Sequence, residues 1–492
     1  MNHLIIFPVV IYLGAAFLLP LLSGKDDFLA GIAASAFAFL SLVVSVLLSI
    51  SVFAGGRIIY FVGGWTKPLG IALMADPLSC LFLVLTNAVA FIIVIYSIVY
   101  MKKYNRAVYF FILFMLMLAG MNGILISMDF FNIFVFFEIA SISSFIIVSF
   151  GLRAEELEAS LKYTVMSFIS STLILFAIAM IYGITGTLSI PAFLHATATA
   201  PQIRLWFTVG LFLSGFAIKA GLVPFHAWLP DAHSMAPAPV SALLSGLFIK
   251  VVGFYTIIRL TSNIFTDIPQ MRILLLTFGM LSMVLGGVAA YGQKNIKRIF
   301  AYSTISQIGY CAIGLGIGGY LGNLGVLMHI ISHAFSKSLL FLNVGAVEYM
   351  TGTTDTEKLN GLNDRMPHTT LLSSTGMLGI AGIPPMGNFW SKLIIILAAV
   401  QAGYAGIAAL CIIVAVMTLG YFLKLQRTVY CSKAGDAVKK EAPAGMLVPM
   451  TVLAFMAVFA GILLIPGIRE ACMDKAVDVM DNFSYTSIAI GD

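Results

Sequence analysis

Long apolar runs, separated by short polar or glycine- and proline-containing segments, make up most of the chain. Each run approaches the roughly 20 residues that an α-helix needs to cross a bilayer. The pattern predicts an all-α polytopic membrane protein with about fourteen spanning helices, too closely spaced for a separate soluble domain. The predicted spans are residues 3–22, 29–53, 77–100, 108–127, 130–150, 163–186, 205–223, 239–260, 273–291, 298–318, 321–347, 370–400, 403–425 and 446–466.

The composition agrees with this pattern. Of the 492 residues, 60% are hydrophobic and only 10% are charged, whereas soluble domains carry about 25% charged residues. The formal net charge of +6 does not indicate nucleic-acid binding, because the basic residues lie between apolar runs and form no continuous patch. The first run has no charged segment before it and no small-residue cleavage site, so we expect a first span rather than a cleaved signal peptide.

The connections between predicted spans differ in charge. Connections after odd-numbered spans hold sixteen lysines and arginines, and connections after even-numbered spans hold five. Because basic residues are enriched in cytoplasmic connections, the odd-numbered connections are predicted to be cytoplasmic and both termini to be outside. The sixteen are Lys25, Lys102, Lys103, Arg106, Arg153, Lys162, Lys294, Lys297, Arg298, Lys358, Arg365, Lys424, Arg427, Lys433, Lys439 and Lys440; the five are Arg57, Lys67, Arg204, Arg259 and Arg272.

Five charged residues lie well inside predicted spans, away from their end residues: Glu138, Lys219, Lys250, Lys337 and Lys392. Placing a charged side chain near the bilayer centre costs at least about 2.5–3.5 kcal/mol of free energy, so we expect these residues to have a role that offsets this cost. One interpretation is static ion pairs between helices, but four lysines cannot all pair with one acid. A lysine without a counter-charge in a low-dielectric site can take up and release a proton near neutrality. The five charges therefore favour a path for protons or other ions.

The eleventh span adds a polar stripe. His329, His333 and Lys337 are spaced four residues apart and fall on one face of a helix. A single histidine there would more often be a satisfied core residue, but two histidines and a lysine on one face favour a proton relay. A metal site is a weaker interpretation, because no carboxylate or thiol is near in sequence and Lys337 would repel a cation.

Two spans are interrupted in the same way. The seventh contains Gly221 to Pro224, and the twelfth contains Gly382, Pro384 and Pro385. Proline removes a helical hydrogen bond and frees backbone carbonyls, which is tolerated at membrane depth only beside protein or a water-filled cavity. His226 and His233 follow the first interruption, where they either line a channel entrance or lie in a connecting loop.

The two interruptions are 161 residues apart, and the fourth and ninth spans begin about 165 residues apart. Spans 4–8 and 9–13 are therefore predicted to be two copies of a five-helix unit. An odd number of helices inverts the second copy, an architecture found in many transporters. We expect one transmembrane domain over 1–492, divided into 1–106 with the first three spans, the repeats 107–262 and 270–430, and 440–492 with the last span and a short tail.

The cysteines do not suggest a redox centre. Cys80, Cys311, Cys411, Cys431 and Cys472 are far apart and form no Cys-x-x-Cys pair. We therefore expect no thiolate-bound metal, no iron–sulfur cluster and no cofactor in this chain.

Several long motifs resemble one known family. KAGLVPFHAWLPDAHSMAPAPVSALLSG, NIKRIFAYSTISQIGY, HIISHAFSKSLLFL and GIPPMGNFWSK occur in the order typical of the antiporter-like subunits of respiratory complex I. That family also includes subunits of membrane-bound group 4 hydrogenases, formate hydrogenlyases and Mrp-type sodium/proton antiporters. The resemblance covers roughly residues 75–430 and implies a fourteen-helix core with inverted repeats and broken helices seven and twelve.

The resemblance also implies roles for the buried charges. Glu138 matches the family's glutamate of the fifth span, and Lys219 matches its lysine partner in the seventh. Lys250 matches the connecting lysine of the eighth span. The remaining matches are the relay of the eleventh span and the terminal lysine, which here are His329, His333, Lys337 and Lys392.

The expected function is translocation of protons or sodium ions by one non-redox subunit of a larger complex. The wording of the motifs favours a redox-driven complex of the hydrogenase or complex I type; the alternative is an Mrp-type antiporter without redox partners. A redox enzyme that handles quinone or metal itself and a structural scaffold are further alternatives. The resemblance implies other antiporter-like and small membrane subunits, peripheral hydrogenase-like or iron–sulfur subunits, lipid and a prokaryotic cytoplasmic membrane as the setting.

Overall fold

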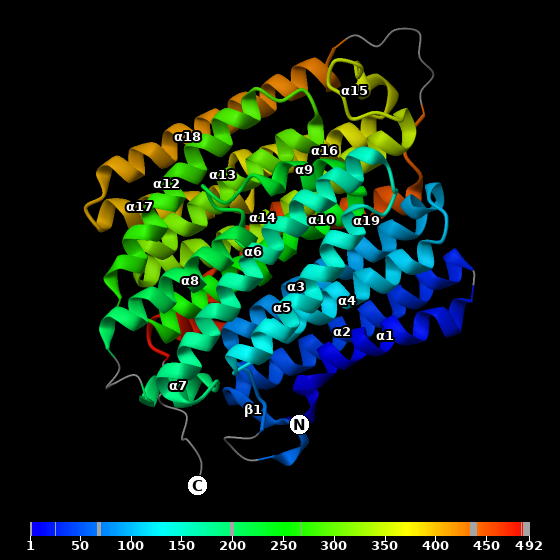
Figure 1. Ribbon diagram of the computed structural model, residues 1–492. Helices are drawn as coiled ribbons and strands as arrows, with labels where there is room; N and C mark the ends of the chain where they lie inside the picture. The colour runs from blue at the N-terminus through cyan, green and yellow to red at the C-terminus, as the bar shows by residue number, and fades with distance from the viewer. Residues whose placement is uncertain are drawn as a thin grey trace.

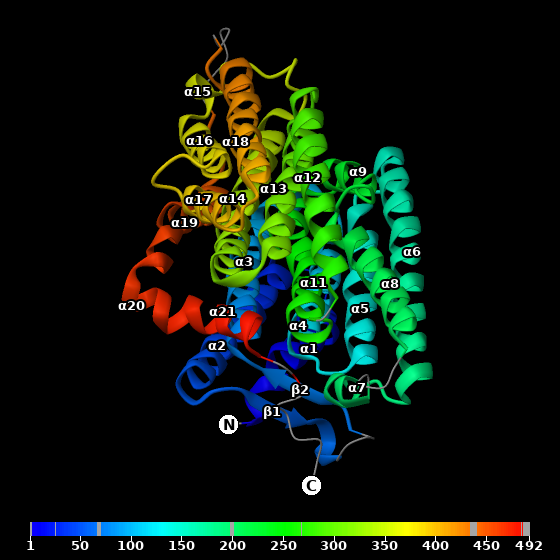
Figure 2. The same cartoon turned by 90° about the vertical axis from the view of Figure 1, so that its left-hand side faces the viewer.

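The computed structural model describes residues 2–24, 26–65, 70–196, 201–266, 268–432, 440–483 and 485. Long helices run side by side in one bundle (Figures 1 and 2). The first and last described residues and a β-hairpin lie at one end, which we call the terminal end, and α15 lies at the opposite end. Four lysines in the charge count lie outside the described residues: Lys25, Lys67, Lys433 and Lys439.

The first part of the chain forms three helices and a hairpin. The helices are α1 (Phe7–Ser23), α2 (Asp27–Gly55) and α3 (Pro77–Tyr100), with short 3₁₀ turns at Asn2–Ile6, Val62–Gly64 and Met101–Lys103. Strands β1 (Ile58–Phe61) and β2 (Ala72–Ala75) pair antiparallel, with Ile58 opposite Ala75. Asp76 caps α3 by accepting a hydrogen bond from the Ser79 amide.

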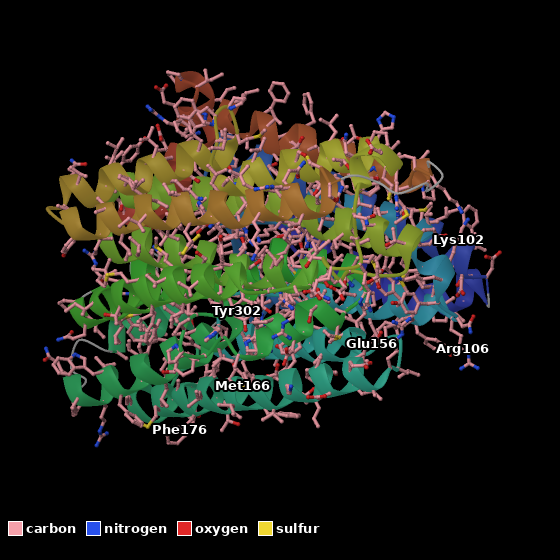
Figure 3. All side chains as sticks on the ribbon, turned by 90° about the horizontal axis from the view of Figure 1, so that it is seen from above. Lys102, Arg106, Glu156, Met166, Phe176 and Tyr302 are labelled. Carbon is pink, nitrogen blue, oxygen red and sulfur yellow. The ribbon has the colours of Figure 1, made fainter. Side chains whose placement is uncertain are left out.

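The predicted first repeat begins with three helices on one side of the bundle. They are α4 (Ala107–Ile126), α5 (Phe130–Val148) and α6 (Ala154–Thr185). In Figure 3, Glu156, Met166 and Phe176 follow α6 from the opposite end toward the terminal end. The repeat continues through α7 (Ile190–Ala196), α8 (Gln202–Ala220), α9 (Trp228–Met235), α10 (Ala238–Leu243), a π-helical stretch (Leu244–Tyr255), α11 (Thr256–Arg259) and a second π-helical stretch (Leu260–Ile264).

The second repeat and the last segment complete the bundle. The repeat contains α12 (Pro269–Tyr291), α13 (Ile296–Ile317), α14 (Gly319–Thr351), α15 (Leu362–Arg365), α16 (Pro367–Ala381), α17 (Gly387–Gln401), α18 (Ala405–Leu425) and a π-helical turn (Gln426–Tyr430). The chain then forms α19 (Ala444–Phe459), a 3₁₀ turn (Ala460–Leu464), α20 (Pro466–Ile468), a π-helical turn (Arg469–Met473) and α21 (Asp474–Asp481).

The all-α, multi-pass architecture is confirmed. In the described residues, twelve helices are long and apolar enough to cross a membrane. The figure of fourteen spans stays a prediction, because α13 and the interrupted pair α16 and α17 lie outside those twelve. The continuous helix over 238–264 and α14 are the most enclosed, with their apolar segments entirely buried. The apolar pattern predicts a sixth span from residue 163, but α6 begins at Ala154, since its first turns are amphipathic rather than uniformly apolar.

Both predicted helix breaks are confirmed, and their geometries match. Each half-helix ends at a glycine in the left-handed region, Gly221 with φ 67° and Gly382 with φ 82°. The next amide donates back to a carbonyl five residues earlier, and the third residue after the glycine is a cis-proline, Pro224 or Pro385. Glycine suits this position because side chains disfavour positive φ. Pro384 lies in the same turn.

The inverted repeats also match in their contacts. On α4, a side chain at Gly120 would collide with the backbones of Phe136 and Ala140 on α5. On α12, Gly286 lies equally close to Tyr302 and Ser306 on α13. Each of these three positions in the second repeat follows the matching position in the first repeat by 166 residues. The same closely packed pair of helices is therefore formed twice. The N-caps Asp129 of α5 and Asn295 of α13 and the isolated bridges Asp129–Ser189 and Asn295–Asp355 keep the same offset.

Candidate ion-translocation path

Lys219 lies near the end of α8 and is fully buried. Its Nζ donates a hydrogen bond of 2.7 Å to Ser167 Oγ on α6. Aromatic rings surround the amine, with the centroids of Phe137, Tyr163 and Phe248 at 5.2, 5.0 and 5.8 Å from Nζ. The ring faces are electron-rich and favour the protonated amine over an equally buried aliphatic site.

Glu138 on α5 is half-buried rather than enclosed. The Ser171 hydroxyl on α6 donates to its carboxylate and also lies 3.0 Å from the Ser167 carbonyl, an alternative acceptor for the same proton. No ion pair joins Glu138 directly to Lys219 in the part of the chain that the structure describes. The two charges are therefore linked through serines of α6, and the carboxylate reaches the outer face of the bundle.

Lys250 lies in the π-helical stretch Leu244–Tyr255 and is 1% exposed. Its Nζ donates to the backbone carbonyl of Ser245. A π-helical turn is rare and often found at functional sites, because it changes which backbone groups are free to accept. The Ser245 hydroxyl is 2.7 Å from that of Thr304 on α13, which joins this helix of the first repeat to the second repeat.

The stripe predicted on the eleventh span lies on α14 and is completely buried. The rings of His329 and His333 are 5.8 Å apart between centroids. His329 Nδ1 lies 2.9 Å from Ser391 Oγ on α17. Lys337 Nζ donates a hydrogen bond of 2.8 Å to the Phe300 carbonyl on α13. Both ring nitrogens of His333 are buried without a partner among the described residues. The buried stripe thus holds two neighbouring imidazoles and an amine that contact α13 and α17.

Lys392 lies on α17, beyond the second break, and is 4% exposed. Its Nζ donates to the carbonyls of Ile380 and Ala381, at 2.7 and 3.2 Å. These carbonyls end α16, where the break leaves them without helical partners. In the first break, Trp228 Nε1 instead donates a hydrogen bond of 2.8 Å to the Ile218 carbonyl at the end of α8.

The two histidines after the first break differ in exposure. His226 is half-buried in the break itself. His233 on α9 is fully enclosed, with its ring 5.7 Å from that of Phe341 and 6.2 Å from that of Trp228. An entrance open to the surface at His233 therefore needs a change in the packing of α9.

Ion pairs that sequence reasoning missed hold the two ends of the bundle. At the terminal end, Arg259 and Asp76 are 2.7 Å apart and both buried. At the opposite end, Glu348 pairs with Lys297 at 2.9 Å and with Lys103 at 3.4 Å. Asp231 on α9 pairs with Arg298 at 2.6 Å and Lys162 at 3.2 Å. The sequence assigns all five basic residues to connections or to the end residues of spans, and hydropathy alone does not show which acids they meet.

Comparisons with known proteins agree with this architecture. The chain matches the family described as NADH:quinone oxidoreductase/Mrp antiporter, TM, over residues 127–418. Residues 66–111 match the family described as NADH-Ubiquinone oxidoreductase (complex I), chain 5 N-terminus.

Similar proteins come from different kinds of complex. A subunit of the Na(+)/H(+) antiporter of Alkalihalophilus pseudofirmus is 35% identical over 429 residues, 86% of each chain. A subunit of the F(420)H(2) dehydrogenase of Methanosarcina mazei is 32% identical over 374 residues, 73% of this chain and 75% of that protein. A chain of an archaeal membrane-bound sulfane sulfur reductase superposes with a TM-score of 0.90 at 29% identity, over 98% of each chain. The chain therefore belongs to the NADH:quinone oxidoreductase/Mrp antiporter family of multi-pass membrane subunits.

Proposed function

We propose that this chain moves protons, with sodium ions as the alternative cargo, as one subunit of a multi-subunit membrane complex. The observation that carries the proposal is the set of buried amines Lys219, Lys250, Lys337 and Lys392. Within the described ranges, none of them has a carboxylate within ion-pair distance. Static pairs that merely fasten helices would have acids beside them, whereas unpaired amines can exchange protons.

The proposed path runs along the membrane from one repeat to the other. It begins at Glu138, passes the serine link to Lys219 and continues to Lys250 in the centre. His329, His333 and Lys337 on α14 carry it to Lys392 at the second break. Movement of a proton away from Lys219 would change the field at Lys250, so the steps are coupled by charge.

The energy source distinguishes two versions of the proposal. In the first, redox subunits that include hydrogenase-like or iron–sulfur proteins drive the transport, as the names of the dehydrogenase and reductase relatives suggest. In the second, an Mrp-type assembly exchanges protons for sodium without redox chemistry, which the 35% identity to a sodium/proton antiporter protein favours. Mass spectrometry of the purified complex would separate them by the presence or absence of redox subunits.

The transport itself is tested with the intact complex in sealed vesicles that contain a pH-sensitive dye. Lys250→Met should lower proton movement at least tenfold, because it removes the central titratable amine. Lys358→Met is the matched control, since this lysine is 73% exposed in a connection and its one ion pair among the described residues is with Asp355. Unchanged transport in Lys250→Met, with the complex assembled, would contradict the proposal.

The membrane topology belongs to the same proposal. We place the opposite end of the bundle in the cytoplasm and both termini outside, and treat 1–492 as one domain with repeats at 107–262 and 270–430. The density of lysine and arginine at the opposite end supports this orientation. His226 and His233 would then lie near the cytoplasmic end of the first repeat.

A further inference from the structure

A groove of about 330 Å³ opens at the opposite end of the bundle. It lies between α12, α13 and α18, and its rim carries Lys424 and the ion pair of Lys294 with Glu357. Its inner wall includes Ile299 and Tyr421, both buried. The Tyr421 hydroxyl has no hydrogen-bond partner among the described residues. The Tyr421 side chain thus lines the groove, while its hydroxyl is buried in the protein.

The groove leads toward one of the buried amines. Tyr421 lies beside Ser303 on α13, whose hydroxyl is also fully buried and without a partner in the described part of the chain. Ser303 is one helical turn from Phe300, whose carbonyl accepts the hydrogen bond from Lys337. Gln307, one turn further along the same face, also has a buried, unpartnered side chain. Buried polar side chains therefore extend from Tyr421 to Ser303 and Gln307, and the carbonyl that Lys337 bonds lies one turn from Ser303.

The matching place in the first repeat is closed. There, Ile133 and Tyr255, which precede Ile299 and Tyr421 by 166 residues, line a cavity of only about 30 Å³ near the terminal end. The Tyr255 hydroxyl donates a hydrogen bond of 2.8 Å to the Leu125 carbonyl. The neighbouring Arg259 forms an ion pair with Asp76. Equivalent positions thus line a small cavity with a bonded tyrosine hydroxyl in one repeat and a larger groove with a tyrosine hydroxyl that has no partner among the described residues in the other.

We propose that this groove is the entrance through which protons from water reach Lys337, with Tyr421 as the transfer group at its floor. A proton arriving on the phenol oxygen is balanced by the phenol's own proton, which leaves toward Ser303, so Tyr421 stays neutral before and after each transfer. The inference rests on the proposed function, and it adds Tyr421 and Ser303 to the path described above.

The access route is tested first, without reference to transport. In the intact complex, the five native cysteines are replaced by alanine, and Ser303→Cys is treated with a cationic, membrane-impermeant methanethiosulfonate reagent. Removing the floor with Tyr421→Ala should speed modification of Ser303→Cys at least tenfold. Ser306→Cys is the matched control, because Ser306 lies on the same helix, is fully buried and faces the Met283 carbonyl instead. Equal rates at the two positions, or no effect of Tyr421→Ala, would overturn the proposal.

The transfer role is tested by Tyr421→Phe, which keeps the ring and removes the hydroxyl. Proton movement in vesicles should fall at least fivefold. Tyr430→Phe should leave it unchanged, since Tyr430 is a buried tyrosine of the same end whose hydroxyl bonds Ser373 outside the groove. If wild-type vesicles move no protons, the proposed function fails while the labelling still decides the groove. If they do and Tyr421→Phe equals wild type, the entrance role is wrong.

Discussion

In the first repeat, hydrogen bonds join an acid to an amine: Glu138 and Lys219 are linked through Ser171 and Ser167 of α6. In the second repeat, the position that matches Glu138 is Thr304, whose hydroxyl instead lies against Ser245 of the first repeat. The buried amines there, Lys337 and Lys392, rest on backbone carbonyls. The same helix plan thus supplies an acid and an amine linked through serines in one copy, whereas the other has Thr304 in place of the acid.

The ends of the repeats differ in the same sense. Arg259 and Asp76 close the terminal end of the first repeat by a buried ion pair. The nearby position in the second repeat, Lys424, lies exposed on the rim of the groove and donates to the Tyr291 carbonyl. One copy therefore has a buried ion pair where the other has an exposed lysine, although the two copies share the same helix plan.

The largest expected effect comes from breaking the sealed end. Arg259→Met leaves Asp76 as a buried carboxylate without its partner, which typically costs about 3–5 kcal/mol. Lys424→Met should cost less than about 1 kcal/mol, because exposed charges contribute little. Denaturant unfolding of both variants in detergent measures the contrast. Similar losses in the two variants would show that the difference between the repeats has no energetic basis.

The serine link gives the next prediction. Ser167→Ala removes the side-chain partner of the Lys219 amine, and a hydrogen bond to a charged group contributes about 1.5–3 kcal/mol. We expect proton movement in vesicles to fall roughly tenfold or more. Ser170→Ala is the control, since Ser170 lies on the same helix, is equally buried and donates to the Gly215 carbonyl. Equal transport in the two variants would mean that Lys219 works without the link.

Hydropathy and proline spacing predicted most of this fold. The apolar runs located the helices, and the glycine–proline interruptions located both breaks, because each signal lies within a few neighbouring residues. The candidate lysines were found for the same reason: a charge inside an apolar run is visible in sequence. The partners were not. Arg259 and Asp76 are 183 residues apart, and Ser167 and Lys219 are 52 apart, so only the packing of helices shows that they meet.

The half-burial of Glu138 was also beyond sequence reasoning. Its run is apolar on all sides, so no period distinguishes a face toward the bundle from one toward the surroundings. The groove at Tyr421 is a similar case, because a tyrosine in an apolar span gives no sign that its hydroxyl is unpartnered. Both features depend on which neighbour is missing, and this is a property of the three-dimensional arrangement.

The two breaks sharpen the comparison at a smaller scale. An alanine in the left-handed region costs about 1–2 kcal/mol, so Gly221→Ala and Gly382→Ala should both lower the free energy of unfolding. The added methyl group would collide with Leu229 in the first break, but would lie 3.1 Å from Lys392 Cδ in the second. We therefore expect Gly221→Ala to lose more stability than Gly382→Ala. The ratio of transport loss to stability loss should be larger in Gly382→Ala. The reverse pattern would show that Lys392 takes no part in proton movement.

The smallest expected effect concerns the matched helix caps. Asp129 accepts hydrogen bonds from the amides of Phe131 and Asn132, and Asn295 accepts one from Arg298. Loss of either cap by substitution with alanine should cost about 1 kcal/mol. Only the aspartate adds a dependence on pH. Burial raises the pKa of Asp129 above its ordinary value of 3.8, and the two amides only partly oppose this.

The sign of that dependence follows from proton linkage. Between pH 3.8 and the raised pKa, folded Asp129 holds more protons than the unfolded chain does, so stability falls as pH rises through this window. Asp129→Asn keeps an acceptor and removes the titration, so the unfolding midpoint should lose this component of its slope above pH 3.8. Asn295→Ala should shift the midpoint equally at all these pH values. If the pH dependence of the unfolding midpoint is unchanged in Asp129→Asn, the two caps behave alike. The repeats then differ in their buried amines and hydroxyls, and the carboxylate of the Asp129 cap adds no further difference.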